Sequence, residues 1–125
     1  MILYLFFTTL IVPLTIAGIG LFWKKNPPRK INNFYGYRSK MSMKNQETWD
    51  FANTHCSIVM WKTGIIMTIF SLIYIFISLI INTDYLIASI YVNMIQVIIL
   101  VLCLFSTERV LKRNFDANGN KITTG

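Results

Sequence analysis

Three long apolar runs separated by polar segments dominate the chain. Residues 2–23 carry no charged side chain, a second run covers about residues 57–82, and a third covers about residues 85–107. A helix of about 20 residues, rising about 1.5 Å per residue, crosses a hydrocarbon core of about 30 Å. The pattern therefore predicts an all-α integral membrane protein with three transmembrane helices in a single membrane domain, residues 1–125.

The first run has a competing interpretation as a cleaved signal peptide. It is longer than the apolar core of such a peptide, no basic residues precede it, and Lys24 and Lys25 follow it. We therefore expect it to remain as the first span. The brief polar turn at residues 82–84 predicts that the second and third spans form an antiparallel hairpin.

Positive charge gathers in two segments of the chain, which has 12 Lys and Arg against 5 Asp and Glu and a net charge of +7. Apart from Lys62 at the start of the second span, the basic residues are Lys24, Lys25, Arg29, Lys30, Arg38, Lys40 and Lys44 before that span, and Arg109, Lys112, Arg113 and Lys121 after the third. Such residues mark cytoplasmic segments, so the N-terminus is expected outside and the C-terminus in the cytoplasm. Because these charges flank spans, we expect contact with membrane lipids and no direct contact with nucleic acid.

The cytoplasmic segment, residues 24–56, differs in composition from the rest. Two prolines at positions 27–28 end the first helix and start a loop. Gly36 lies between Tyr35 and Tyr37, which predicts a turn with positive φ or a close backbone approach, with Arg38 projecting from it.

A helix is expected to begin near Ser42, a candidate N-cap, and to lead into the second span. Asn45, Trp49 and Asn53 recur every four residues and so share one face of it. If this face enters the inner edge of the bilayer, its amides and indole N–H need partners. Two interpretations stay open: a polar latch that holds the loop to the helix, or a ligand or partner site built on the same residues.

The third span carries Ser89, Asn93 and Gln96 at helical spacing. Exposure of these side chains to lipid would cost free energy, so we expect them to face the bundle interior and to form interhelical hydrogen bonds. A pathway for a solute or a proton is the alternative.

Catalytic and metal-binding patterns fail on inspection of the sequence. His55 and Cys56 are adjacent and diverge by about 100° on a helix. The tail at residues 116–120 resembles a calcium loop with a misplaced glycine, and we expect a frayed turn there. No acidic pair, phosphate cradle or Ser/His/Asp set stands in the sequence. We therefore expect no enzyme activity, no metal and no cofactor.

The run from Asn32 to Arg38 and the following helix resemble the signature of the SdpI family of bacterial membrane proteins. In that family an Asn, a Gly and an Arg precede a Ser/Thr-rich link, and a Trp follows on the next helix. Asn32, Gly36, Arg38 and Trp49 take these positions. The full set of signature and companion residues is Asn32, Tyr35, Gly36, Tyr37, Arg38, Ser42, Asn45, Trp49 and Asn53.

The resemblance implies a protein of the bacterial cytoplasmic membrane that gives immunity to a membrane-active peptide toxin. It also implies signalling, by engaging a cytoplasmic transcriptional regulator. The alternative is a membrane enzyme or transporter subunit that binds an anionic lipid or solute at Arg38 and Trp49. A structural helper subunit is a third interpretation, and a homo-oligomer is compatible with each of them.

The expected topology puts the signature on the cytoplasmic side, whereas a secreted toxin arrives from outside. Either the protein contacts the toxin within the bilayer, or the signature residues serve a step other than contact with the toxin.

Overall fold

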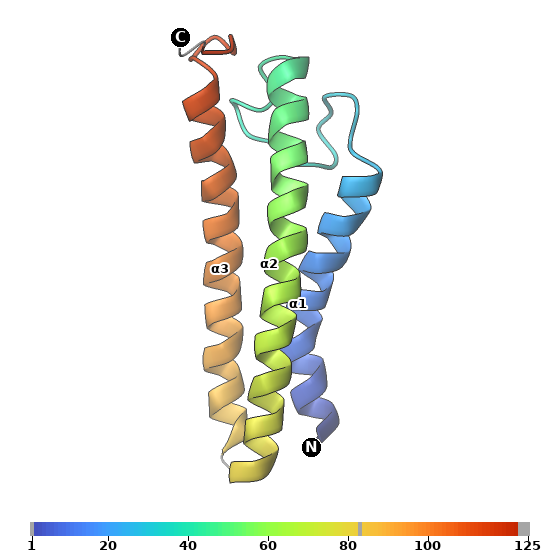
Figure 1. Ribbon diagram of the computed structural model, residues 1–125, viewed down its shortest axis with the longest axis vertical. Helices are drawn as coiled ribbons and strands as arrows, with labels where there is room; N and C mark the ends of the chain where they lie inside the picture. Colours follow the sequence, from blue (N-terminus) through green and yellow to red (C-terminus); the bar gives the residue numbers. More distant parts are fainter. Residues whose placement is uncertain (1, 83, 123–125) are drawn as a thin grey trace.

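Three long helices lie side by side in the computed structural model, which describes residues 2–82 and 84–122. They are α1 (Ile2–Lys25), α2 (Gln46–Ile81) and α3 (Tyr85–Asn114). The two ends of the chain lie at opposite ends of the bundle (Figure 1). All three helices are long and apolar enough to cross a membrane. The predicted all-α membrane fold with three spans is confirmed.

The second helix continues without a break from the polar segment into the apolar run, as predicted. Its 36 residues would extend about 54 Å, so part of the helix projects beyond a hydrocarbon core of about 30 Å. The projecting turns lie at the same end of the bundle as the connection between α1 and α2 and the end of α3 (Figure 1). We call this the basic end, because both basic segments lie there.

The predicted N-cap at Ser42 is wrong by three residues, because Asn45 caps α2. The Asn45 Oδ1 accepts from the Thr48 N–H at 2.9 Å, and the Thr48 hydroxyl oxygen accepts from the Asn45 N–H at 3.1 Å. Serine and asparagine are both favourable N-cap residues, so Ser42 and Asn45 are comparable candidates. Asn45 prevails because Thr48 completes a reciprocal capping box, whereas the Ser42 hydroxyl is engaged in a turn with Ser39.

The hairpin between α2 and α3 is as short as predicted. Asn82 ends α2 in a left-handed conformation with φ of 54°. The Asp84 side chain then caps α3 by accepting from the Leu86 N–H at 3.3 Å. Thr83 lies outside the described residues.

Close packing of α1 on α2 depends on small residues. A Cβ at Gly20 would lie 2.4 Å from the backbone nitrogen of Trp61, and a Cβ at Gly64 would lie 2.4 Å from that of Ala17. Such approaches are typical of membrane helices, where small residues let backbones meet. The glycines therefore fix α1 and α2 as a tightly packed pair.

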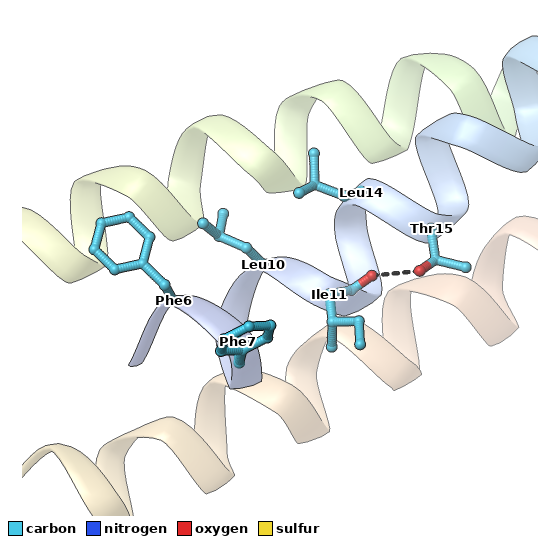
Figure 2. A pocket seen from close by; sticks show the side chains of 6 residues that line it. All are labelled: Phe6, Phe7, Leu10, Ile11, Leu14 and Thr15. Atoms are coloured by element: carbon cyan, nitrogen blue, oxygen red, sulfur yellow. Dashed lines mark hydrogen bonds between the residues drawn. The ribbon is translucent and has the colours of Figure 1, made fainter. Parts of the chain in front are cut away.

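The outer faces of the helices are apolar and exposed, as lipid contact requires. A surface depression on α1 has a volume of about 450 Å³. Figure 2 shows the side chains that line it: Phe6, Phe7, Leu10, Ile11, Leu14 and Thr15. Its one hydroxyl, on Thr15, donates to the Ile11 carbonyl within the same helix at 2.5 Å. The depression therefore offers only apolar contact.

We predict that Gly20→Ala destabilises the protein by about 1–3 kcal/mol, because the added methyl meets the α2 backbone. Gly18→Ala is the matched control, since a Cβ there meets nothing within 4 Å. Free energies of unfolding in mixed detergent micelles would test this. Equal values for the two variants would contradict the close approach.

Candidate functional site

The loop between α1 and α2 is held against α2 by two side chains. Trp49 is fully buried, and its indole N–H donates to the Pro28 carbonyl at 2.6 Å. The Asn53 Oδ1 accepts from the Tyr37 N–H at 2.7 Å, and the Asn53 Nδ2 donates to the Tyr37 carbonyl at 3.3 Å. We call this arrangement, with Gly36, the loop latch.

Gly36 lets the loop come this close. Its φ is +102°, and a Cβ would lie 2.7 Å from the Asn53 Oδ1 and 2.9 Å from the Pro28 Cγ. Both a strained backbone and a steric clash exclude other residues. The prediction of a turn with positive φ at Gly36 is confirmed.

Asn32 shapes the preceding turn without contacting α2. Its Oδ1 accepts from the backbone N–H groups of Phe34 and Tyr35, each at 2.9 Å, and its Nδ2 donates to the Lys30 carbonyl. Asparagine at a turn commonly satisfies its own neighbours in this way. Tyr35 itself is exposed, so its ring takes no part in the loop latch.

Of the remaining two signature companions, Ser42 holds the loop internally and Asn45 joins it to the tail. The buried Ser42 hydroxyl lies 3.1 Å from the Tyr37 carbonyl. The Asn45 Nδ2 donates to the Gly119 carbonyl at 2.7 Å. The expectation of a frayed turn at residues 116–120 is wrong, because this bond and an Asp116 side chain that accepts from two backbone N–H groups hold the turn.

Tyr37 links the loop to the third helix. Its hydroxyl donates to the Glu108 carboxylate at 2.6 Å. Burial raises the pKa of Tyr37 well above its ordinary value of 10, and the hydrogen bond to Glu108 and its charge raise it further. The hydroxyl therefore stays protonated and remains a donor at physiological pH.

Arg38 lies apart from the loop latch. Its side chain is exposed and donates to the Asn33 carbonyl, and no carboxylate pairs with it in the part of the chain that the structure describes. It borders an open groove of about 360 Å³ that also involves Ser39 and Glu108 and continues over Leu104 of α3. The structure thus brings Trp49, Asn53, Gly36 and Tyr37 together and leaves Arg38 on the outside.

Two of the three polar residues predicted to face the interior of the third span do so. Ser89 and Gln96 are buried, and the Ser89 hydroxyl lies 3.3 Å from the Tyr74 hydroxyl of α2. The Gln96 Nε2 donates to the Ser71 hydroxyl oxygen of α2 at 2.9 Å. Asn93 as a residue is only partly buried, and its buried Oδ1 has no hydrogen-bond partner among the described residues.

The same Gln96 amide also contacts the first span. Proline has no N–H, so Pro13 cannot donate to the carbonyl of Thr9 one turn earlier. The Gln96 Nε2 donates to this carbonyl at 2.9 Å. One amide group therefore joins all three helices near the middle of the predicted third span.

Sequence reasoning missed the partners that these residues use. Thr48 could have been found, because a threonine three residues after a cap is a capping-box pattern. Glu108 and Thr107, which contact Tyr37 and His55 respectively, carried no local signal.

Among the described residues, no group of three His, Cys, Asp or Glu side chains could hold a metal ion.

Comparison with known proteins assigns this arrangement to a family. A model of the SdpI/YfhL protein family matches residues 29–107, well over half of the chain. The chain belongs to the SdpI/YfhL family. The matched region contains Gly36, Trp49 and Asn53 of the loop latch, all of α2 and most of α3, so the predicted resemblance is confirmed.

A curated relative supports the same assignment over a shorter segment. The chain is 40% identical over 52 residues to a Bacillus subtilis (strain 168) protein named uncharacterized protein YfhL. The aligned segment covers 42% of this chain and 46% of that protein, so the match spans about half of the relative. No solved structure matches the chain.

We predict that Trp49→Phe speeds tryptic cleavage of the loop by about fivefold to a hundredfold in lipid vesicles with the basic end accessible. Phe keeps the ring but leaves the buried Pro28 carbonyl without its donor, which costs about 1–3 kcal/mol. Trp61→Phe is the matched control, because no other described residue accepts a hydrogen bond from that indole. Equal cleavage rates would contradict the loop latch.

We predict that Tyr37→Phe reduces the loss of stability at high pH. The pKa of Tyr37 is raised on folding, so its contribution is complete below its ordinary pKa of 10 and is lost as the pH rises toward the folded value. The free energy of unfolding, measured at pH 8 and pH 11, should fall more for the wild type than for Tyr37→Phe. The same decrease in both proteins would contradict the raised pKa of Tyr37 in the folded protein.

Proposed function

We infer that the protein is a non-enzymatic protein of the bacterial cytoplasmic membrane that confers immunity to, or senses, a membrane-active peptide. Membership of the SdpI/YfhL family supports this class. One observation carries the inference: the polar groups of the signature residues Trp49 and Asn53 form hydrogen bonds with the loop backbone. A role in fixing a surface suits such residues better than a role in chemistry.

The charge distribution supports an orientation for this function. Both basic segments lie at one end of the bundle, which the positive-inside tendency assigns to the cytoplasm. The N-terminus is then outside, and a peptide that arrives from outside meets the spans before the loop. The loop is available to anionic lipid headgroups, worth about 1 kcal/mol per nearby basic residue, or to a cytoplasmic transcriptional regulator.

A second candidate function is the binding of an anionic lipid or solute by Arg38. It is favoured by one observation: this guanidinium is exposed, has no carboxylate partner among the described residues, and borders a groove that continues over the apolar Val101 and Phe105. A phosphate on Arg38 with an acyl chain along α3 would match this order of groups. The carboxylate of Glu108 in the same groove opposes an anion.

A survival assay tests the leading proposal. A toxin-sensitive bacterial host expresses the wild type, Trp49→Ala, Arg38→Ala or Lys40→Ala at matched membrane levels, and is challenged with peptide toxins secreted by its own and sibling strains. We expect the wild type to raise survival, Trp49→Ala to lose protection because the loop is released, and Arg38→Ala to lose it because the exposed signature cation is gone. Lys40→Ala is the control, since Lys40 is an exposed cation of the same loop.

Failure of the wild type to protect against every peptide tested would overturn the immunity proposal. In that case, binding of vesicles containing phosphatidylglycerol that is retained by Lys40→Ala and lost in Arg38→Ala would support the second candidate.

A further inference from the structure

The amide of Gln96 is only half satisfied. Its Nε2 has two acceptors, on Thr9 and Ser71, whereas its Oε1 is buried and has no hydrogen-bond partner. The whole side chain is 4% exposed. A carbonyl oxygen that lacks a donor in an apolar environment is unfavourable, and buried polar groups of this kind are normally paired. Gln96 therefore offers one strong acceptor to a further group.

Gln96 lines a groove that opens between α2 and α3. The groove has a volume of about 340 Å³, and Gln96, Ser71 and Tyr74 are the lining residues with polar side-chain groups. Its apolar walls include Met67, Phe70 and Ile99. This volume is at the small end of the range for ligand sites. The groove is therefore suited to one or two bulky side chains and too small for a whole helix.

Depth in the membrane restricts what can supply the donor. Gln96 lies at the centre of the predicted span 85–107, about 16 Å from either end at 1.5 Å per residue. Donors of phospholipids sit in the headgroup region, and acyl chains carry none. In a membrane helix the backbone N–H groups are already paired. A donor at this depth comes from a polar side chain, such as Ser, Thr or Trp, on a helix inserted in the bilayer.

We propose that the α2–α3 groove binds a membrane-inserted helical peptide, which places one donor side chain on the Gln96 Oε1 and apolar side chains along the groove. The proposal rests on the proposed function, and it names the site at which the membrane-active peptide is met. It places contact within the bilayer, on the path of a peptide that enters from outside. The loop latch then needs no direct contact with the toxin.

A binding experiment in vesicles tests the groove without a toxin. The probe is a lysine-flanked polyleucine helix with one central serine, compared with the same helix carrying alanine, and energy transfer to the labelled protein reports association. One interhelical hydrogen bond contributes about 0.6–1.7 kcal/mol, so the serine helix should bind about three- to twentyfold more tightly. Gln96→Leu should abolish this preference, because it removes the acceptor.

A second variant separates the groove from the stability of the bundle. Val92→Phe fills the groove and leaves the Gln96 bonds in place, whereas Val97→Phe adds the same ring on a different face of α3. We expect the serine preference to be lost in Val92→Phe and retained in Val97→Phe. No preference in the wild type, or a preference that survives in Val92→Phe, would overturn the proposal. So would self-association that Val92→Phe abolishes, because it would assign the groove to a second copy of the chain.

The survival assay distinguishes this proposal from the proposed function. If the wild type protects and Val92→Phe at matched membrane level protects equally well, the groove proposal fails and the immunity function stands. If the wild type gives no protection while the serine preference is present in vesicles, the function fails and the groove remains a helix-binding site.

Discussion

The arrangement of the basic end depends on the amide of Asn53 and its two bonds to the backbone of Tyr37. A loop has no internal hydrogen-bond ladder, so each of its backbone groups that leaves water needs a partner. Asn53 supplies a donor and an acceptor from one side chain, and Trp49 supplies a donor for the buried Pro28 carbonyl. Gly36 is the one residue that leaves space for both. Without these contacts, backbone groups of the loop would lose their hydrogen bonds to water on packing against α2 and would gain no partners, which is unfavourable.

The loop latch also explains why Tyr37 and Arg38 have different roles although they are adjacent. The backbone of Tyr37 is fixed to α2, and its hydroxyl then reaches Glu108 on α3. Arg38 is thereby turned outward, where its charge faces solvent or headgroups. The signature therefore combines residues that hold the loop in place with one residue, Arg38, that the loop exposes at the protein surface.

The sequence was sufficient for features that depend on local chemistry. The three spans follow from apolar runs, and the positive φ of Gly36 follows from its place between two tyrosines. The cap at Asn45 was missed because Ser42 is equally good in isolation, and the reciprocal bonds between Asn45 and Thr48 decide between them. Pro13 shows from the sequence that the Thr9 carbonyl lacks its usual helical donor. The group that replaces this donor, the amide of Gln96, is 87 residues away in the sequence and could not be predicted. Asn93 was expected inside, although its position is about 60° around the helix from Gln96.

The two polar regions of the protein are mechanically connected through α3. The glycines join α1 and α2 by direct backbone contact. Gln96 attaches α3 to both of these helices in mid-span, and Glu108 attaches α3 to Tyr37 of the loop at the basic end. These two residues lie 12 positions apart on one continuous helix, about 18 Å. The contacts of α3 in mid-span and at the basic end are therefore made by one continuous helix.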